Sequence, residues 1–128
     1  MPSRRQGLGS AGENQAAHYL EKRGYSIRER NWHCPYGEID IVAEKGDWLV
    51  FVEVKTRRGA QFGSPEESIT PSKRRKLVAA AQTYLQTLGG ELPTQWRLDV
   101  AIVELSSAGK LQRLEVLENA IPTPEDGF

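Results

Sequence analysis

The sequence predicts a single α/β domain in which a mixed central β-sheet is flanked by helices. Two segments carry apolar residues at helical spacing, and residues 38–55 are rich in the β-branched and aromatic residues typical of buried strands. The length of 128 residues suits one domain. We place that domain at residues 10–121, between a flexible arm at residues 1–9 and a C-terminal tail at residues 122–128.

The first half of the chain is expected to form one helix and three strands. Ser10 suits the N-cap of a helix that Lys22, Arg23 and Gly24 end. The last two strands form a hairpin with its turn at Lys45-Gly46-Asp47. The helix is predicted over residues 10–23, and the strands over residues 25–31, 38–44 and 48–55.

The second half is expected to contribute one helix and two strands. Residues 57–68 have the composition of a loop. Thr70 and Pro71 then suit the N-cap and first turn of a helix that reaches Leu88. Its apolar stripe is Leu77, Ala81, Tyr84 and Leu88. Two strands over residues 96–105 and 111–117 complete the order α-β-β-β-α-β-β, with the two helices on opposite faces of the sheet.

Composition limits the function without naming it. The chain contains one cysteine, Cys34, no apolar run that could span a bilayer and no secretory signal, so we expect a cytoplasmic protein that does not enter membranes. The net charge is zero, although basic residues form clusters. Such clusters can bind phosphates, but most charge runs are solvated faces.

The stretch GEIDIVAEKGDWLVFVEVKTR, residues 37–57, carries the chemistry. Glu53 and Lys55 share one face of a strand, and the hairpin turn places Asp40 opposite residues 51–53. Charged side chains in an apolar strand are costly to bury unless they are paired or bound to a ligand. The Asp40 and Glu53 carboxylates, with the Val54 carbonyl, therefore predict a site for Mg²⁺ or Mn²⁺.

Such a site can hydrolyse a phosphodiester, since a bound metal polarises the phosphate and activates water. Lys55 could orient the water or neutralise the phosphate, and sequence leaves both roles open. The alternative interpretation is an amphipathic hairpin with these side chains in solvent. Apolar residues on both faces of the strands argue against that alternative, because such strands are usually buried on both sides.

Further residues extend the candidate site. Glu13 shares a helix face with Ala17 and Leu20, so it points toward the sheet, and it could equally complete a capping box with Ser10. The basic residues offer a patch for a nucleic-acid backbone, although an exposed basic turn is the default interpretation. These residues are Arg57, Arg58, Lys73, Arg74, Arg75 and Lys76.

Three other polar residues are assigned to structure. Asp99 is interpreted as a partner of Arg97, although an acid on a strand could also act on the site. His33 and Cys34 are adjacent, which is not a zinc-site spacing and indicates a turn-region pair.

An ordered set of motifs resembles the YraN-like family of small bacterial proteins. The motifs are GE in the first helix, RN after the first strand, GEIDIVA, VFVEVKTR, K-x-x-x-L and RLDV, which together cover about Gly9 to Ala120. The resemblance implies the restriction-endonuclease-like fold of the PD-(D/E)xK superfamily, similar to archaeal Holliday junction resolvases. One departure is visible, since Ile39 stands where that motif has proline before the aspartate.

The resemblance also implies roles for single residues. Asp40, Glu53 and Lys55 match the superfamily's catalytic aspartate, glutamate and lysine, and Glu13 matches the acidic residue on the first helix of the resolvase-like branch. The expected function is an Mg²⁺-dependent endonuclease acting on DNA, including branched DNA. A twofold homodimer is a natural expectation, because resolvase-like proteins cut two strands symmetrically. The alternatives are a non-catalytic nucleic-acid-binding module with the same fold and an enzyme acting on a small phosphorylated molecule.

Overall fold

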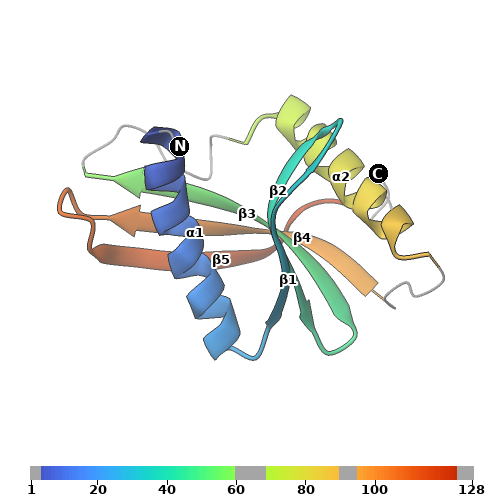
Figure 1. The fold of residues 1–128 in the computed structure, drawn as a ribbon, viewed down its shortest axis with the longest axis horizontal. Coiled ribbons are helices and arrows are strands. Elements are labelled where there is room, and N and C mark those ends of the chain that lie inside the picture. The colour runs from blue at the N-terminus through green and yellow to red at the C-terminus, as the bar shows by residue number, and fades with distance from the viewer. Residues whose placement is uncertain (1–3, 60–68, 90–94, 124–128) are drawn as a thin grey trace.

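The fold is a five-stranded mixed sheet with two helices, as predicted (Figure 1). The computed structural model describes residues 4–59, 69–89 and 95–123, and only the backbone of residues 4–9. The element order α-β-β-β-α-β-β is confirmed. The elements are α1 (Arg4–Lys22), β1 (Ser26–Cys34), β2 (Gly37–Lys45), β3 (Trp48–Arg58), α2 (Pro71–Thr87), β4 (Gln95–Leu105) and β5 (Leu111–Ile121).

The strands lie in sequence order across the sheet. All neighbours are antiparallel except β3 and β4, which run parallel. A parallel connection needs a crossover, and α2 lies in the segment between those two strands. In the β2–β3 hairpin Lys45 pairs with Trp48, so the turn is the two residues Gly46 and Asp47. The positive φ of +59° at Gly46 suits such a short turn.

The two helices cover opposite faces of the sheet, which confirms the predicted arrangement. Figure 1 shows the sheet between α1 and α2. One core cluster joins α2 to side chains such as Phe51 and Leu98, and the other joins α1 to side chains such as Val50 and Ala101. Central strand β3 therefore sends apolar side chains to both faces, as its sequence indicated.

Several predicted boundaries are wrong. Helix α1 begins at Arg4, so Ser10 lies inside the helix and is not its N-cap. Residues 4–9 of the predicted arm are therefore helical, and residues 1–3 lie outside the described residues. Strands β1 and β5 run on to Cys34 and Ile121, because each stays paired with its neighbour to that point.

The loop predicted over residues 57–68 also begins too early. Arg57 and Arg58 continue β3, pairing with Glu104 and Leu105 of β4, and residues 60–68 lie outside the described residues. The start predicted for α2 is confirmed, since the Thr70 side chain accepts a hydrogen bond from the Lys73 amide at 3.1 Å. In the apolar stripe predicted for α2, Leu77, Ala81 and Tyr84 are buried, and Leu88 is partly buried.

The alternation of β2 breaks near Asp40. Ile39 and Val42 pack on the α2 face, whereas Ile41 packs on the α1 face. Strict alternation would put Ile39 and Ile41 on the same face. Asn31, in the neighbouring strand β1, has a positive φ of +53°, a conformation that asparagine tolerates better than most residues. The sheet is therefore locally distorted where the candidate site lies.

Candidate functional site

The site lies where β2 and β3 separate. Their pairing runs from Lys45↔Trp48 to Ile41↔Val52, and β3 then continues beside β4. Beyond the last pair, the Val54 amide N–H donates to Asp40 Oδ2 at 2.8 Å. A carboxylate thus takes the amide hydrogen that a backbone carbonyl accepts in a regular ladder. The register confirms that Asp40 comes next to Glu53, as the hairpin prediction required.

Asp40 and Glu53 form a carboxyl pair inside the protein. Glu53 is only 6% exposed. Burial raises the pKa of Asp40, and so do its hydrogen bond with Glu53 and the charge of Glu53, whereas the Val54 N–H lowers it; the resulting pKa is about 9. Two neighbouring carboxyl groups cannot both ionise cheaply, so the pair holds a proton or needs a cation.

Helix α1 brings Glu13 to this pair because Gly12 lets the helix approach β3 closely. A Cβ on Gly12 would lie 1.8 Å from Thr56 Oγ1, so a larger residue does not fit there. The Glu13 side chain is 13% exposed, and Arg30 Nη2 lies 3.6 Å from its Oε1. Burial raises the pKa of Glu13, although the hydrogen bond from Asn31 and the charge of Arg30 oppose this shift.

Glu38 is a further acidic residue of the site, which the sequence interpretation did not include. One carboxylate oxygen from each of Glu13, Glu38 and Asp40 lies within 4.8 Å of the others. Asn31 Nδ2 donates to Glu13 Oε1 and to Glu38 Oε1, each at 2.8 Å, and so holds two of the three together. The signal was present, since Glu38 stands two residues before Asp40 in GEID. We call Glu13, Glu38, Asp40 and Glu53 the acidic cluster.

Two lysines complete the site on the α2 side. Burial lowers the pKa of Lys55, and the neighbouring Lys73 lowers it further. Lys73 Nζ lies 3.2 Å from Glu53 Oε2. Burial lowers the pKa of Lys73, but the hydrogen bond with Lys55 and the charge of Glu53 outweigh it, so the pKa is raised. Lys73 therefore belongs to the site and not to an exposed basic turn.

The other predicted phosphate-binding residues lie on the first turns of α2 and at the end of β3. Arg74, Arg75 and Lys76 are exposed on the first turns of α2. Arg57 is partly buried and Arg58 exposed, both at the end of β3. The Val54 amide donates a hydrogen bond to Asp40. That the Val54 carbonyl binds a metal ion stays a prediction. The phosphate-binding roles of the five arginine and lysine residues also remain predictions.

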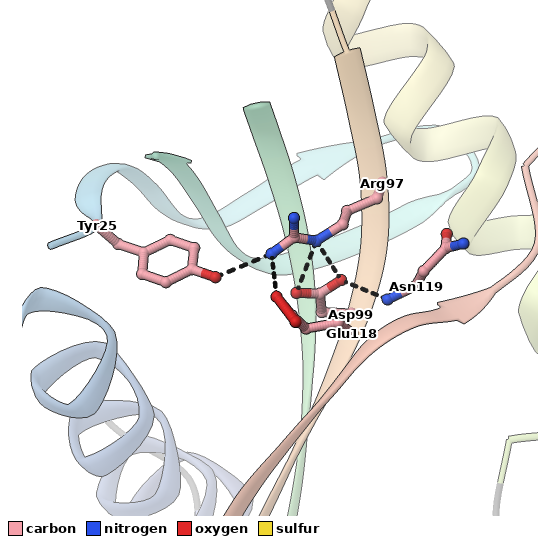
Figure 2. A network of polar contacts seen from close by, with 5 residues as sticks. All are labelled: Tyr25, Arg97, Asp99, Glu118 and Asn119. Carbon is pink, nitrogen blue, oxygen red and sulfur yellow. Dashed lines mark hydrogen bonds and ion pairs between the residues drawn. The ribbon is translucent and has the colours of Figure 1, made fainter. Parts of the chain in front are cut away.

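Asp99 serves a separate, structural network, shown in Figure 2. Arg97 Nε donates to both carboxylate oxygens of Asp99, at 3.0 and 3.2 Å, and the Asn119 amide donates to Oδ1 at 2.8 Å. Arg97 Nη2 also binds Tyr25 and Glu118, at 2.9 Å each. The preferred interpretation, that Asp99 is the partner of Arg97, is therefore confirmed. We call these five residues the Arg97–Asp99 network.

His33 and Cys34 take no part in the converging carboxylates. Both lie on β1, and within the described ranges the group whose ligand atoms converge contains neither of them. The predicted turn-region pair is thus part of a strand.

Comparison with known proteins identifies the family. Residues 12–103 match the family described as "Uncharacterised protein family UPF0102". This chain belongs to that family. The match confirms the YraN-like resemblance and spans Glu13, the hairpin residues and Lys73.

Other UPF0102 proteins are similar to this chain over most of their length. A UPF0102 protein of Symbiobacterium thermophilum is 48% identical over 113 residues, covering 88% of this chain and 94% of the relative. One from Roseiflexus castenholzii is 42% identical over 121 residues, covering 94% and 98%. One from Syntrophomonas wolfei is 59% identical over 80 residues, covering 62% and 70%. No helix in the described ranges of this UPF0102 chain is long and apolar enough to cross a membrane.

Proposed function

We propose that this protein is a metal-dependent endonuclease that hydrolyses phosphodiester bonds in DNA. The observation that carries the proposal is the convergence of three carboxylates where β2 and β3 separate, with the Glu53 carboxyl group next to one of them, Asp40, and a lysine beside the site. Carboxyl groups this close repel one another when ionised, and a divalent cation relieves that repulsion. The clustered carboxyl groups therefore lower the stability of the folded protein, and a bound cation would raise it.

The donor set fits Mg²⁺ or Mn²⁺, because every candidate ligand is an oxygen. Asp40 and Glu53 are the proposed central ligands. Glu13 and Glu38 each place a carboxylate oxygen within 4.8 Å of one of Asp40 and offer additional oxygens, directly or through water. A cation bound there would polarise the scissile phosphate and lower the pKa of a bound water. In the reaction the water oxygen would bond to phosphorus and release a proton to solvent, the P–O bond to the leaving sugar oxygen would break, and that oxygen would take up a proton from solvent.

Lys55 is the proposed phosphate-facing residue of β3. It stands two residues after Glu53, so both side chains lie on the α2 face. An ammonium group beside the reacting phosphate stabilises the negative charge that grows there, and it can also orient the attacking water. Partial burial strengthens this interaction, because the surroundings screen charge less than water does.

The substrate class rests on the resemblance between the motif order and PD-(D/E)xK nucleases. Asp40, Glu53 and Lys55 occupy the motif positions, and Glu13 is the acidic residue on the first helix. By the same resemblance we propose branched DNA as a preferred substrate, a twofold dimer that cuts both strands, and action in the cytoplasm. Sedimentation of the protein alone and with a four-way junction tests the dimer.

The proposal is tested with supercoiled, linear, single-stranded and four-way-junction DNA, each with Mg²⁺, Mn²⁺ or EDTA. Glu53→Gln and Asp40→Asn should lower the cleavage rate by about 100-fold or more, since each removes a charged ligand. Glu44→Gln is the matched control, because Glu44 lies on β2 but pairs with Arg28. It should cleave like the unaltered protein.

Two results would redirect the proposal. Metal-dependent cleavage that survives in Glu53→Gln would mean that another site performs the reaction. DNA binding without cleavage, equal in the unaltered protein and Glu53→Gln, would instead establish a non-catalytic binding module.

A further inference from the structure

Lys73 differs from the three basic residues that follow it on α2. The side chains of Arg74, Arg75 and Lys76 are exposed, whereas Lys73 is partly buried with its ammonium 3.2 Å from Glu53 Oε2. An exposed lysine pair would gain little from such a contact. Here the carboxylate partner is only 7% exposed, so the ammonium is held at the wall of the site.

The backbone of α2 fixes this position. Thr70 caps the helix by accepting a hydrogen bond from the Lys73 amide at 3.1 Å, and Pro71 follows the cap. Ile69, just before the cap, is buried in the core on the same side of the sheet. The first turn of α2 is thus anchored by a cap and by a buried side chain, and Lys73 projects from it toward β3.

Two ammonium groups therefore meet on the α2 face of β3. Strand alternation puts Lys55 on the same face as Glu53, and Glu53 Oε2 lies 3.2 Å from Lys73 Nζ. Each lysine also shifts the pKa of the other. Like charges on neighbouring side chains are unfavourable unless an anion joins them. A divalent cation bound to Glu53 would neutralise part of its negative charge. Glu53 would then balance the two ammonium groups less well, and the α2 side of the site would carry a net positive charge.

We propose that Lys73 binds a DNA phosphate beside Lys55, with Glu53 holding its ammonium in place before the substrate arrives. The inference rests on the proposed function for the identity of the anion. It divides the site into a carboxylate side, formed by α1 and β2, and a two-lysine side, formed by α2 and β3. The phosphate group would lie between the two sides.

The test measures DNA binding separately from cleavage. Affinity for a short duplex and for a four-way junction is measured over a range of salt concentrations, with Ca²⁺ and again with EDTA, and a gel checks that the DNA stays intact. Each phosphate contact contributes about 0.9 to the slope of log affinity against log salt. Lys73→Gln should reduce that slope by about 1, whereas Lys73→Arg should keep it.

Two further variants make the result specific. Lys22→Gln removes one exposed positive charge from the last turn of α1, outside the predicted binding patch, and should leave the slope nearly unchanged. Lys73→Met keeps the apolar stem and replaces Lys73→Gln if the latter does not fold. Equal slopes for Lys73→Gln, Lys73→Met and the unaltered protein would overturn the inference, as would an equal loss in Lys22→Gln.

The failures of the two proposals are distinguishable. If Lys73 variants change the slope but no DNA form is cleaved, the phosphate contact stands and the nuclease proposal fails. If cleavage occurs and Lys73→Gln alters neither the slope nor KM, the nuclease stands and this inference fails. Absence of any DNA binding by the unaltered protein would overturn both.

Discussion

Asp40 and Asp99 are carboxyl groups on strands of one sheet, and they have opposite surroundings. Asp99 is 0% exposed and accepts hydrogen bonds from Arg97 and from the Asn119 amide. Asp40 accepts one from the Val54 amide, and the carboxylates of Glu13 and Glu38 converge on it. In the Arg97–Asp99 network the positive charge of Arg97 balances the buried carboxylate. In the acidic cluster the carboxyl groups outnumber the lysine and arginine side chains that lie beside them.

The difference shows how structural and functional buried charges can be told apart. Burial raises the pKa of both aspartates, so a raised pKa alone does not separate them. The neighbours do, since Arg97 lowers the pKa of Asp99 and Glu53 raises that of Asp40 further. A carboxyl group whose neighbours oppose its charge is suited to bind a cation.

Removing Asp99 should give the largest loss of stability. Asp99→Ala leaves the Arg97 guanidinium, 13% exposed, without its buried carboxylate partner, and we expect a loss of about 3 kcal/mol in the free energy of unfolding. Urea unfolding measures it. Glu118→Ala removes the 64% exposed partner of the same arginine and should cost under about 1 kcal/mol. Equal losses in the two variants would contradict the comparison.

Enlarging Gly12 should damage the acidic cluster through the position of α1. Gly12→Ala places a methyl group against Thr56, and such overpacking costs about 1–3 kcal/mol. Because Glu13 follows directly, DNA cleavage should fall as well. Thr56→Ala in the Gly12→Ala background removes the closest clashing atom and should restore part of both. A double variant no better than Gly12→Ala would show that the contact with Thr56 is not the cause.

Asp40→Asn should stabilise the metal-free protein while abolishing cleavage. The pKa of Asp40 is about 9 in the folded protein, against about 3.9 in an unfolded chain. Between these values the folded state holds a proton that the unfolded state has lost, so Asp40 makes stability fall as pH rises. The amide of asparagine does not titrate and can still accept the Val54 hydrogen bond.

Urea unfolding in EDTA at pH 5 and pH 8 measures this effect. The gain of Asp40→Asn over the unaltered protein should grow with pH and reach at least about 1 kcal/mol at pH 8. A gain that is constant or shrinks between the two pH values would refute the assigned direction.

A small effect is expected for Tyr25→Phe. The variant removes the hydroxyl that accepts from Arg97 Nη2 at 2.9 Å, while Asp99 and Glu118 still accept from the guanidinium. We expect a loss of about 1 kcal/mol in thermal or urea unfolding and no change in cleavage. A loss of cleavage without a loss of stability would show that the Arg97–Asp99 network acts on the site, which would remove the contrast drawn above.

Local patterns in the sequence determined much of the fold. The alternating apolar residues and the Gly46 turn placed Asp40 beside Glu53, because a short hairpin has only one register that buries its apolar side chains. Thr70 and Pro71 marked the start of α2, because capping is a local interaction. The predicted start of α1 was wrong. Ser10 has the residue type of an N-cap, but the helix already begins at Arg4.

The tertiary structure decided how the site is completed. Glu38 joins the acidic cluster because the Asn31 side chain donates hydrogen bonds to both Glu13 and Glu38 and so holds the two carboxylates together near Asp40. Lys73 reaches Glu53 because α2 packs on the face of β3 that carries Glu53, and Glu13 arrives because Gly12 admits α1 against Thr56. Periodicity reports which side of an element is buried. Which distant side chains then meet depends on how the elements pack, and that is a property of the folded chain as a whole.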